Sequence, residues 1–394
     1  LTTFLKVNRA RNWEEFRNAF RTYAVSAQNF LYADVEGNVG HVLAIGKPVR
    51  SNPTDRDLIQ PPQSSLLRID APTDLPSGFN PPDGFIASSN NRPTDVDDLG
   101  WFYSTNDRID RLQSQLRQTP KVSLDDLKRL QRDVFSQSSL DLKTLLIERG
   151  TPLLAKPPLN PLQERLWHTL EGWDGVYLST SRGPIAFEAL GYQIARIMFL
   201  QRYNGDEELS TIAATGDAWK SAVHAHLNKL DDGALEPLLR EALEEAEEDF
   251  ETFETWGQKH TIHVQHILGN VPWLGKRFRL DTFGADGSSD TLFKRASSPG
   301  PGEQTVRYGA NARHISDLTD LDANWFVLFG GNDGWVISPQ TADQVQLWKR
   351  GEYMQLPMRL ETVRTMFTHV NTISPSTDTP TPTRPTASRS AATE

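Results

Sequence analysis

The chain has 394 residues, of which 37% are hydrophobic, and a formal net charge of −10. This length suffices for one large or two ordinary domains, and the negative charge gives no electrostatic support for binding nucleic acid. No apolar run reaches the roughly 18 residues that a membrane span requires, and the lack of cysteine excludes disulfides and cysteine-bound metals.

The first elements that the sequence predicts are a capped helix and a β-hairpin. Residues 12–21 are expected to form the helix, because Asn12 can accept a hydrogen bond from its first turn. Two strands are predicted at 29–34 and 39–45, and Gly37 between them tolerates the positive φ of a tight turn. This first part of the chain is therefore predicted to have a structural role and not a catalytic one.

A proline-rich stretch comes next and leads into an unusual polar motif. Residues 51–82 contain seven prolines and no clear periodicity, which predicts a long ordered surface loop. The motif GFIASSNNRP follows: residues 84–88 suit a short buried strand, Asn90 and Asn91 come at its end, and Pro93 stops it. The two amide side chains are thereby expected at the mouth of a strand.

An asparagine in this position has two readings. Its amide offers two N–H donors, so it can stabilise a developing oxyanion without transferring a proton. Alternatively, Asn90 and Asn91 form an Asx turn that simply ends the strand. The residues around the motif, described below, favour the first reading.

The region from 106 to about 257 is predicted to be mainly helical. Ser123 and Asn160 are suited to cap helices, and Gly150 is a plausible C-terminal stop. The segment 234–256 is the clearest amphipathic helix, and its strongly acidic side is expected to be a solvated face rather than a docking surface for a basic partner. Further helices are expected at 107–117, from 161 to about 173, and at 184–201.

The remainder is predicted to be rich in β-structure. His260, His263 and His266 are spaced so that neither a strand nor a helix would gather them at one metal ion, so a packing role is expected. The glycine-rich loop 330–334 lacks the Lys-Ser/Thr ending of a phosphate-binding loop. Residues 373–394, rich in Ser, Thr and Pro, are predicted to be a disordered tail. Strands are expected at 290–293, 305–308, 313–315 and 325–329.

Four blocks in this order carry a family resemblance: QNFLYADVEGNVGH at 28–41, GFIASSNNRP at 84–93, Asn-Asp-Arg at 106–108 and SPQTADQVQLWKRGEY at 338–353. Together they resemble the later part of the β chain of the penicillin acylase family of N-terminal-nucleophile amidohydrolases, from about residue 1 to 358.

The resemblance implies a mixed α/β fold, the αββα four-layer sandwich of these hydrolases, incomplete in this chain and carrying a large helical insertion. Residues 1–105 would belong to the catalytic core, 106–257 to the helical region, and 258–372 to a β-rich return to the core. Residues 373–394 remain the predicted tail.

The resemblance also implies roles for individual residues. By its position in the motif, Asn90 rather than Asn91 matches the asparagine that holds the oxyanion. Arg108 matches an arginine that orients that asparagine and the amino-terminal nucleophile; its plainer alternative is a surface salt bridge on a helix with Asp107 or Asp110. Family members carry a structural calcium, for which Asp98 aligns best as a ligand. Asp97 could substitute for it, and the other calcium ligands would lie outside the sequence.

The implied activity is hydrolysis of a linear amide, such as a penicillin-type or acyl-homoserine-lactone-type side chain, through an acyl-enzyme. Leu1 can act neither as nucleophile nor as its base, so the chain is expected to begin downstream of the nucleophile and to be inactive alone. Its partners would be the α chain and the first part of the β chain. The alternatives are an inactive homologue, a protein that binds acyl compounds without turnover, or a non-catalytic adhesion or scaffold protein. The family suggests a periplasmic or secreted location.

Overall fold

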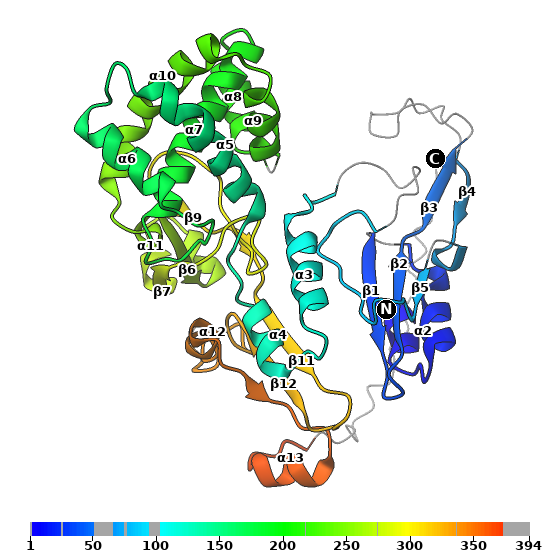
Figure 1. Ribbon diagram of the computed structural model, residues 1–394. Coiled ribbons are helices and arrows are strands. Elements are labelled where there is room, and N and C mark those ends of the chain that lie inside the picture. Colours follow the sequence, from blue (N-terminus) through cyan, green and yellow to red (C-terminus); the bar gives the residue numbers. More distant parts are fainter. Residues whose placement is uncertain are drawn as a thin grey trace, which may run out of the picture.

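The computed structural model describes residues 2–24, 27–50, 66–74, 77–93, 103–216, 218–273, 275–335 and 337–372. It is a mixed fold in which a helical region lies apart from a smaller N-terminal region, with β-strands below and between them in the view of Figure 1. The predicted tail at 373–394 lies outside the described residues. Within those residues, no helix combines the length and apolar character needed to cross a bilayer.

The N-terminal region packs short helices against a three-stranded antiparallel sheet of order β1-β2-β5. Asn12 caps α2 by accepting a bond from the Glu15 N–H at 2.9 Å, as predicted. The predicted hairpin is confirmed as β1 paired with β2, and Gly37 has a φ of 86°. The elements are α1 (Thr2–Val7), α2 (Trp13–Ala19), the 3-10 helix η1 (Phe20–Thr22), β1 (Gln28–Ala33), β2 (Val39–Ala44), β3 (Lys47–Arg50), β4 (Leu66–Asp70), η2 (Pro72–Asp74) and β5 (Ser77–Phe79).

A small aromatic core holds this region together. Trp13 and Phe16 of α2 pack with Phe20 against Val42 and Ala44 of the sheet. The Trp13 ring lies directly over Gly40, where an added Cβ would come within 2.2 Å of the ring. The absence of a side chain at this position therefore lets the helix approach the sheet closely.

Two predictions for this region were wrong. The loop expected at 51–82 contains two strands, β4 paired with β3 and β5 paired with β2. None of its prolines falls within either strand, so both segments keep the N–H groups that a ladder needs. Residues 84–88, expected as a buried strand, join no sheet among the described residues: Gly84 is an exposed bend with a φ of 74°, and residues 85–88 are half-buried.

The helical region is built around α7, which is buried along nearly its whole length and contacts α6, α8, α9, α10 and α11. The predicted caps at Ser123 and Asn160 both form reciprocal capping boxes. The large apolar core of the molecule lies here. The helices are α3 (Asp107–Gln118), α4 (Leu124–Leu130), α5 (Gln137–Leu154), α6 (Pro161–Glu171), α7 (Gly183–Arg202), α8 (Glu207–Ala214), α9 (Trp219–Leu227), α10 (Asp232–Thr252) and α11 (Trp256–Lys259).

The prediction that a helix stops at Gly150 was wrong, because α5 continues to Leu154. Gly150 is instead buried where α5 crosses α6, and an added Cβ would lie 2.5 Å from the Trp167 ring. The glycine is thus explained by close helix packing and not by a helix end.

The last part of the described chain alternates short strands with loops. The predictions near 313–315 and 325–329 are confirmed as β11 and β12. The strand expected at 290–293 is a turn, in which the Thr291 hydroxyl bonds backbone carbonyls on both sides. The strand expected at 305–308 falls across the end of β9 and the start of β10.

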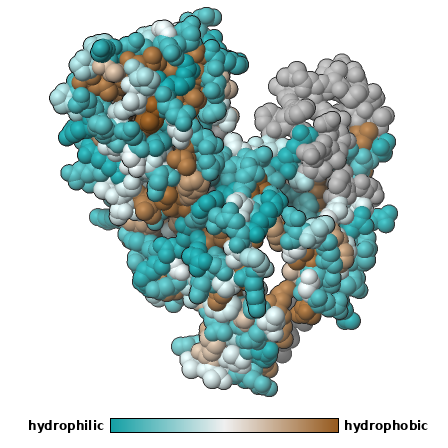
Figure 2. Space-filling model, viewed as in Figure 1, coloured by the Kyte–Doolittle hydropathy of each residue, from teal (hydrophilic) through white to brown (hydrophobic). Residues whose placement is uncertain are grey.

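The elements of this part are β6 (His260–Gln265), η4 (Ile267–Asn270), η5 (Gly275–Phe278), β7 (Arg279–Gly284), β8 (Arg295–Ala296), β9 (Gln304–Thr305), β10 (Tyr308–Gly309), β11 (Ala312–Ser316), β12 (Asn324–Leu328), α12 (Val345–Arg350), β13 (Met354–Gln355) and α13 (Leu360–Met366). They form a sheet of order β7-β6-β9, a second of order β11-β12-β13, and the pair β8 and β10. The face seen in Figure 2 is mostly hydrophilic, with hydrophobic side chains in scattered patches.

Candidate functional site

Asn90 occupies a backbone conformation that few residues tolerate. Its φ is 61°, in the left-handed region where asparagine and glycine are favoured. The backbone N–H of Ser104 donates to the Asn90 carbonyl at 3.0 Å and so ties this turn to the segment before α3. The polar motif is therefore held in one geometry by contacts across the intervening loop.

Arg108, in the first turn of α3, reaches back to the same motif. Its Nη2 donates to the Ser89 carbonyl at 2.7 Å, to the Asn90 Oδ1 at 3.1 Å and to the Ser104 hydroxyl at 3.3 Å. The Asp107 carboxylate, considered as a partner of Arg108, accepts instead from the Ser138 N–H at 2.9 Å. The structure thus brings the two predicted residues, Asn90 and Arg108, into direct contact.

The contact determines which end of the Asn90 amide points outward. Because Arg108 is only a donor, it must face the amide oxygen, and the Nδ2 group is directed away from it. No partner for that nitrogen is present among the described residues. The Asn90 side chain is exposed in the described part of the chain.

Asn91 is used quite differently. Its Oδ1 accepts from the Ser89 N–H at 3.0 Å, and its Nδ2 donates to the Arg92 carbonyl at 2.9 Å. Both ends of this amide are satisfied by neighbouring backbone, as in a residue that shapes a turn. Of the two asparagines, Asn90 is therefore the one whose amide N–H groups have no partner among the described residues. Asp98 and Asp97, the expected calcium ligands, lie outside the described residues.

The histidine trio does not converge on a metal. His260 is buried in β6, its ring stacks on Trp256 at 4.6 Å, and its two nitrogens lie 3.1 Å from the carbonyls of Ala285 and Arg295. Burial lowers the pKa of His260 to about 4. Within the described residues, no group of three or more His, Cys, Asp or Glu side chains is arranged to hold a metal ion.

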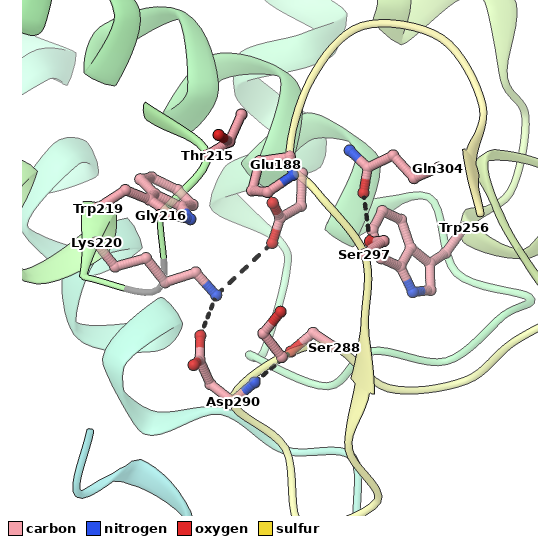
Figure 3. A pocket seen from close by; sticks show the side chains of 12 residues that line it. Glu188, Thr215, Gly216, Trp219, Lys220, Trp256, Ser288, Asp290, Ser297 and Gln304 are labelled. Atoms are coloured by element: carbon pink, nitrogen blue, oxygen red, sulfur yellow. Dashed lines mark hydrogen bonds and ion pairs between the residues drawn. The ribbon is translucent and has the colours of Figure 1, made fainter. Parts of the chain in front are cut away.

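A second polar cluster, which the sequence did not predict, lies inside the helical region (Figure 3). Lys220 of α9 is 6% exposed, and its Nζ donates to Asp290 Oδ2 at 2.7 Å and to the Ser139 hydroxyl at 2.9 Å. It also lies 3.7 Å from Glu188 Oε1, which accepts from the Tyr177 hydroxyl at 2.7 Å. One ammonium is thus surrounded by two carboxylates and two hydroxyls.

The electrostatics of this cluster are those of a satisfied ion network. Burial alone would lower the pKa of Lys220, but the nearby charges, Asp290 foremost, raise it well above its ordinary value. Burial together with the Glu188 charge raises the pKa of Tyr177 in the same direction. Both groups therefore keep their protons at neutral pH, which favours a structural role over acid–base chemistry.

The size of the adjoining cavity supports the same conclusion. The cavity beside Lys220 and Glu188 holds about 20 Å³, which is room for about one water molecule and not for an organic substrate. The residues of the Lys220 cluster come from α5, the segment between α6 and α7, α7 itself, α9 and the loop after β7, so no short sequence motif predicts the cluster. The available signal was a lysine and a glutamate, Lys220 and Glu188, inside otherwise apolar helical stretches.

Comparison with known proteins gives a consistent result. A family model described as penicillin amidase matches residues 1–365. The chain is similar to the penicillin acylase 2 proenzyme of Pseudomonas sp. (strain SE83), with 26% identity over 358 residues, which cover 84% of this chain and 44% of that protein. It is also similar to penicillin G acylase of Escherichia coli, with 28% identity over 184 residues, or 44% of this chain and 21% of that protein.

The fold has a counterpart among solved structures. A thermostable penicillin G acylase from Alcaligenes faecalis superposes with a TM-score of 0.65 over 96% of this chain and 72% of that chain, at 17% sequence identity. This likeness concerns the fold alone: the mixed α/β fold of the chain is similar to that of this acylase, as expected. The chain spans less than half the length of the two curated relatives.

Proposed function

The chain belongs to the penicillin amidase family, and from this premise we propose that the protein hydrolyses linear amides through an acyl-enzyme, with Asn90 as an oxyanion donor and Arg108 as the residue that orients it. The nucleophile would be an N-terminal Ser, Thr or Cys supplied by polypeptide outside this sequence. The two curated relatives are named for action on penicillins, so an acylated amine of that kind is the first substrate class to test.

In the proposed reaction the nucleophile's oxygen or sulfur attacks the amide carbonyl carbon, and its proton passes to the free α-amine of the same residue. The carbonyl oxygen becomes an oxyanion, which accepts a hydrogen bond from Asn90 Nδ2. The C–N bond then breaks, the amine leaves with the transferred proton, and water hydrolyses the acyl-enzyme to release a carboxylic acid. Asn90 thereby stabilises charge without gaining or losing a proton.

The observation that carries the proposal is the contact between Arg108 Nη2 and Asn90 Oδ1. A guanidinium at the oxygen end of an amide withdraws electron density and fixes the N–H donors on the opposite side. Preorganised donors of this kind need no rearrangement when the oxyanion forms. The free donors of Asn90, beside the satisfied amide of Asn91, support assigning the role to the first asparagine.

A structural calcium remains part of the proposal. Asp98, or Asp97 in its place, would contribute one carboxylate oxygen to a cation that requires several. The described residues contain no group of three or more His, Cys, Asp or Glu side chains that could hold it, and its proposed role is structural.

The proposal is tested by substituting Asn90→Gly in the complete protein and following hydrolysis of a panel of acyl 4-nitroanilides. Glycine removes the amide yet tolerates the left-handed backbone, so the fold should be kept. We expect kcat to fall about 10²–10³-fold, the usual loss for one oxyanion donor. Asn204→Gly is the matched control, since Asn204 is also exposed and has a φ of 54°, but lies beyond α7.

Two outcomes would contradict the proposal. An unchanged rate in the Asn90→Gly protein would reduce Asn90 to a turn residue. Binding of acyl compounds by the complete wild-type protein, without release of any amine, would favour the alternative of an inactive, acyl-binding homologue.

A further inference from the structure

Two buried arginines, Arg295 of β8 and Arg313 of β11, lie beside Trp348 of α12 and form no ion pair with any described residue. Arg295 is 2% exposed and Arg313 is 3% exposed. The Arg295 guanidinium lies over the rings of Phe293 and Trp348, at 3.9 Å and 4.3 Å from their centroids. The Arg313 guanidinium lies 4.7 Å from the centroid of the Trp348 ring, so both cations contact this ring.

These guanidiniums are only partly satisfied. Arg295 Nη1 donates to the carbonyls of Lys294 at 2.6 Å and Ala310 at 2.8 Å, and Arg313 Nη2 donates to the Trp348 carbonyl. Five buried nitrogens have no hydrogen-bond partner in the part of the chain that the structure describes: Nε and Nη2 of Arg295, Nε and Nη1 of Arg313, and Nε1 of Trp348. No ion pair among the described residues includes either arginine. Burial, together with the Arg313 charge, lowers the pKa of Arg295 to about 9, so it is still charged at neutral pH.

An uncompensated buried charge is costly, and contact with aromatic faces offsets only part of the cost. Lys220 shows how this molecule treats a buried cation elsewhere, with the Asp290 carboxylate at 2.7 Å. The Asp286 carboxylate raises the pKa of Arg295 and lines a neighbouring cavity with it, but it forms no ion pair with Arg295 among the described residues. The contrast indicates that Arg295 can accept a further anionic partner that those residues do not supply.

A cavity of about 320 Å³ adjoins Arg295 and has the size of a small-molecule site. Arg307 is a second cation in its wall, while Ile262, Val306, Phe329 and Trp348 give it an apolar side. Among the described residues that line this cavity there is no carboxylate. The neighbouring cavity of about 190 Å³ also touches Arg295, but it is lined by Asp286, which would repel an anion.

We propose that the 320 Å³ cavity binds a small organic carboxylate, with the charged end toward Arg295 and Arg307 and an apolar body against Ile262, Val306 and Phe329. Arginine is the side chain best suited to carboxylates, because its planar N–H groups match the two oxygens. The inorganic anions lack the body that the apolar wall would cover. This site is separate from Asn90, and the inference does not rest on the proposed amide hydrolysis.

The test is titration calorimetry of the protein with 3-phenylpropionate, its neutral amide 3-phenylpropionamide, and sulfate. We expect the carboxylate to bind at least about tenfold more tightly than either comparison compound, the effect of a charge-assisted contact. Equal binding of the amide would remove the role of charge. Equal binding of sulfate would remove the organic ligand, and no binding of the carboxylate would overturn the site.

Variants locate the binding. Arg295→Met keeps an apolar stem between the rings and removes the charge, and it should weaken carboxylate binding at least about tenfold. Arg307→Met, in the more accessible wall, should weaken it in the same direction and serves if the first variant fails to fold. Arg165→Met, at an exposed position on α6, is the control and should bind as the wild type does. Unchanged affinity in both cavity variants would contradict the proposal.

Discussion

The Asn90 motif and the Lys220 cluster are both built around a cation that bonds side-chain oxygens, yet they differ in what is left over. Arg108 satisfies the oxygen end of the exposed Asn90 and leaves the two N–H donors without a partner among the described residues. Lys220 is buried, and its contacts include two carboxylates and two hydroxyls. The proposed oxyanion donor keeps N–H groups that the described residues do not use, whereas the Lys220 cluster directs its donors to partners within the chain.

The largest effect on stability should come from breaking the Lys220 cluster. Lys220→Met removes one charge and leaves the carboxylates of Asp290 and Glu188 buried without their cation. We expect the free energy of unfolding to fall by about 3–5 kcal/mol, as for other buried pairs that lose one partner. Denaturant unfolding measures it, and the exposed Lys229→Met should change by less than about 0.5 kcal/mol. A loss below about 1 kcal/mol for Lys220→Met would mean that the cluster is not a structural one.

A smaller effect is expected from His260, which is buried and fully contacted like the Lys220 cluster. Its pKa is about 4 in the folded protein, below the ordinary value of 6.5, because burial disfavours the charged ring. Between these pH values the unfolded chain binds a proton that the folded chain does not. The stabilisation is therefore complete above pH 6.5 and is lost as the pH falls toward 4, by at most about 1.4 kcal/mol per pH unit.

The substitution His260→Gln should lower, by about one, the number of protons that the protein takes up on unfolding in this pH range. Denaturant unfolding between pH 4.5 and 7 would show a flatter profile for the variant. His168→Gln, at an exposed position on α6, should keep the wild-type profile. Parallel profiles for His260→Gln and the wild type would show that His260 is protonated alike in both states.

The smallest effect separates the backbone of Asn90 from its side chain. Because its φ is 61°, alanine at this position is strained whereas glycine is not. Asn90→Ala should unfold at about 1 kcal/mol lower stability than Asn90→Gly, while both lose the amide equally. The same difference is expected between alanine and glycine at Asn204, whose φ is 54°. If the two Asn90 variants were equally stable, the left-handed conformation would not be a constraint on the motif.

The sequence predicted those features whose cause is local. The caps at Asn12, Ser123 and Asn160 depend on a side chain and a backbone N–H two or three residues away, and all three are confirmed. The prediction that a helix ends at Gly150 was wrong, because this glycine is explained by its close packing against Trp167. The strands inside 51–82 were missed because the prolines around them dominate the composition.

For the candidate site, too, the sequence predicted what is close along the chain and missed what is distant. Asn90 and Arg108 were found through the order of short motifs, and their contact spans only 18 residues of chain. The Lys220 cluster joins residues 81 and 70 positions away, in Ser139 and Asp290, so no spacing rule could reveal it. The outward direction of the Asn90 donors likewise follows from a tertiary contact that the sequence does not state.

The central claim is that Asn90 and Arg108 act as one unit on the oxyanion, and a double-mutant cycle on kcat tests it most directly. In the complete protein we expect Arg108→Met to slow amide hydrolysis when Asn90 is present and to add little once Asn90 is glycine, because its target is then gone. Effects that simply multiply in the double variant would contradict the account, since the two residues would then act independently.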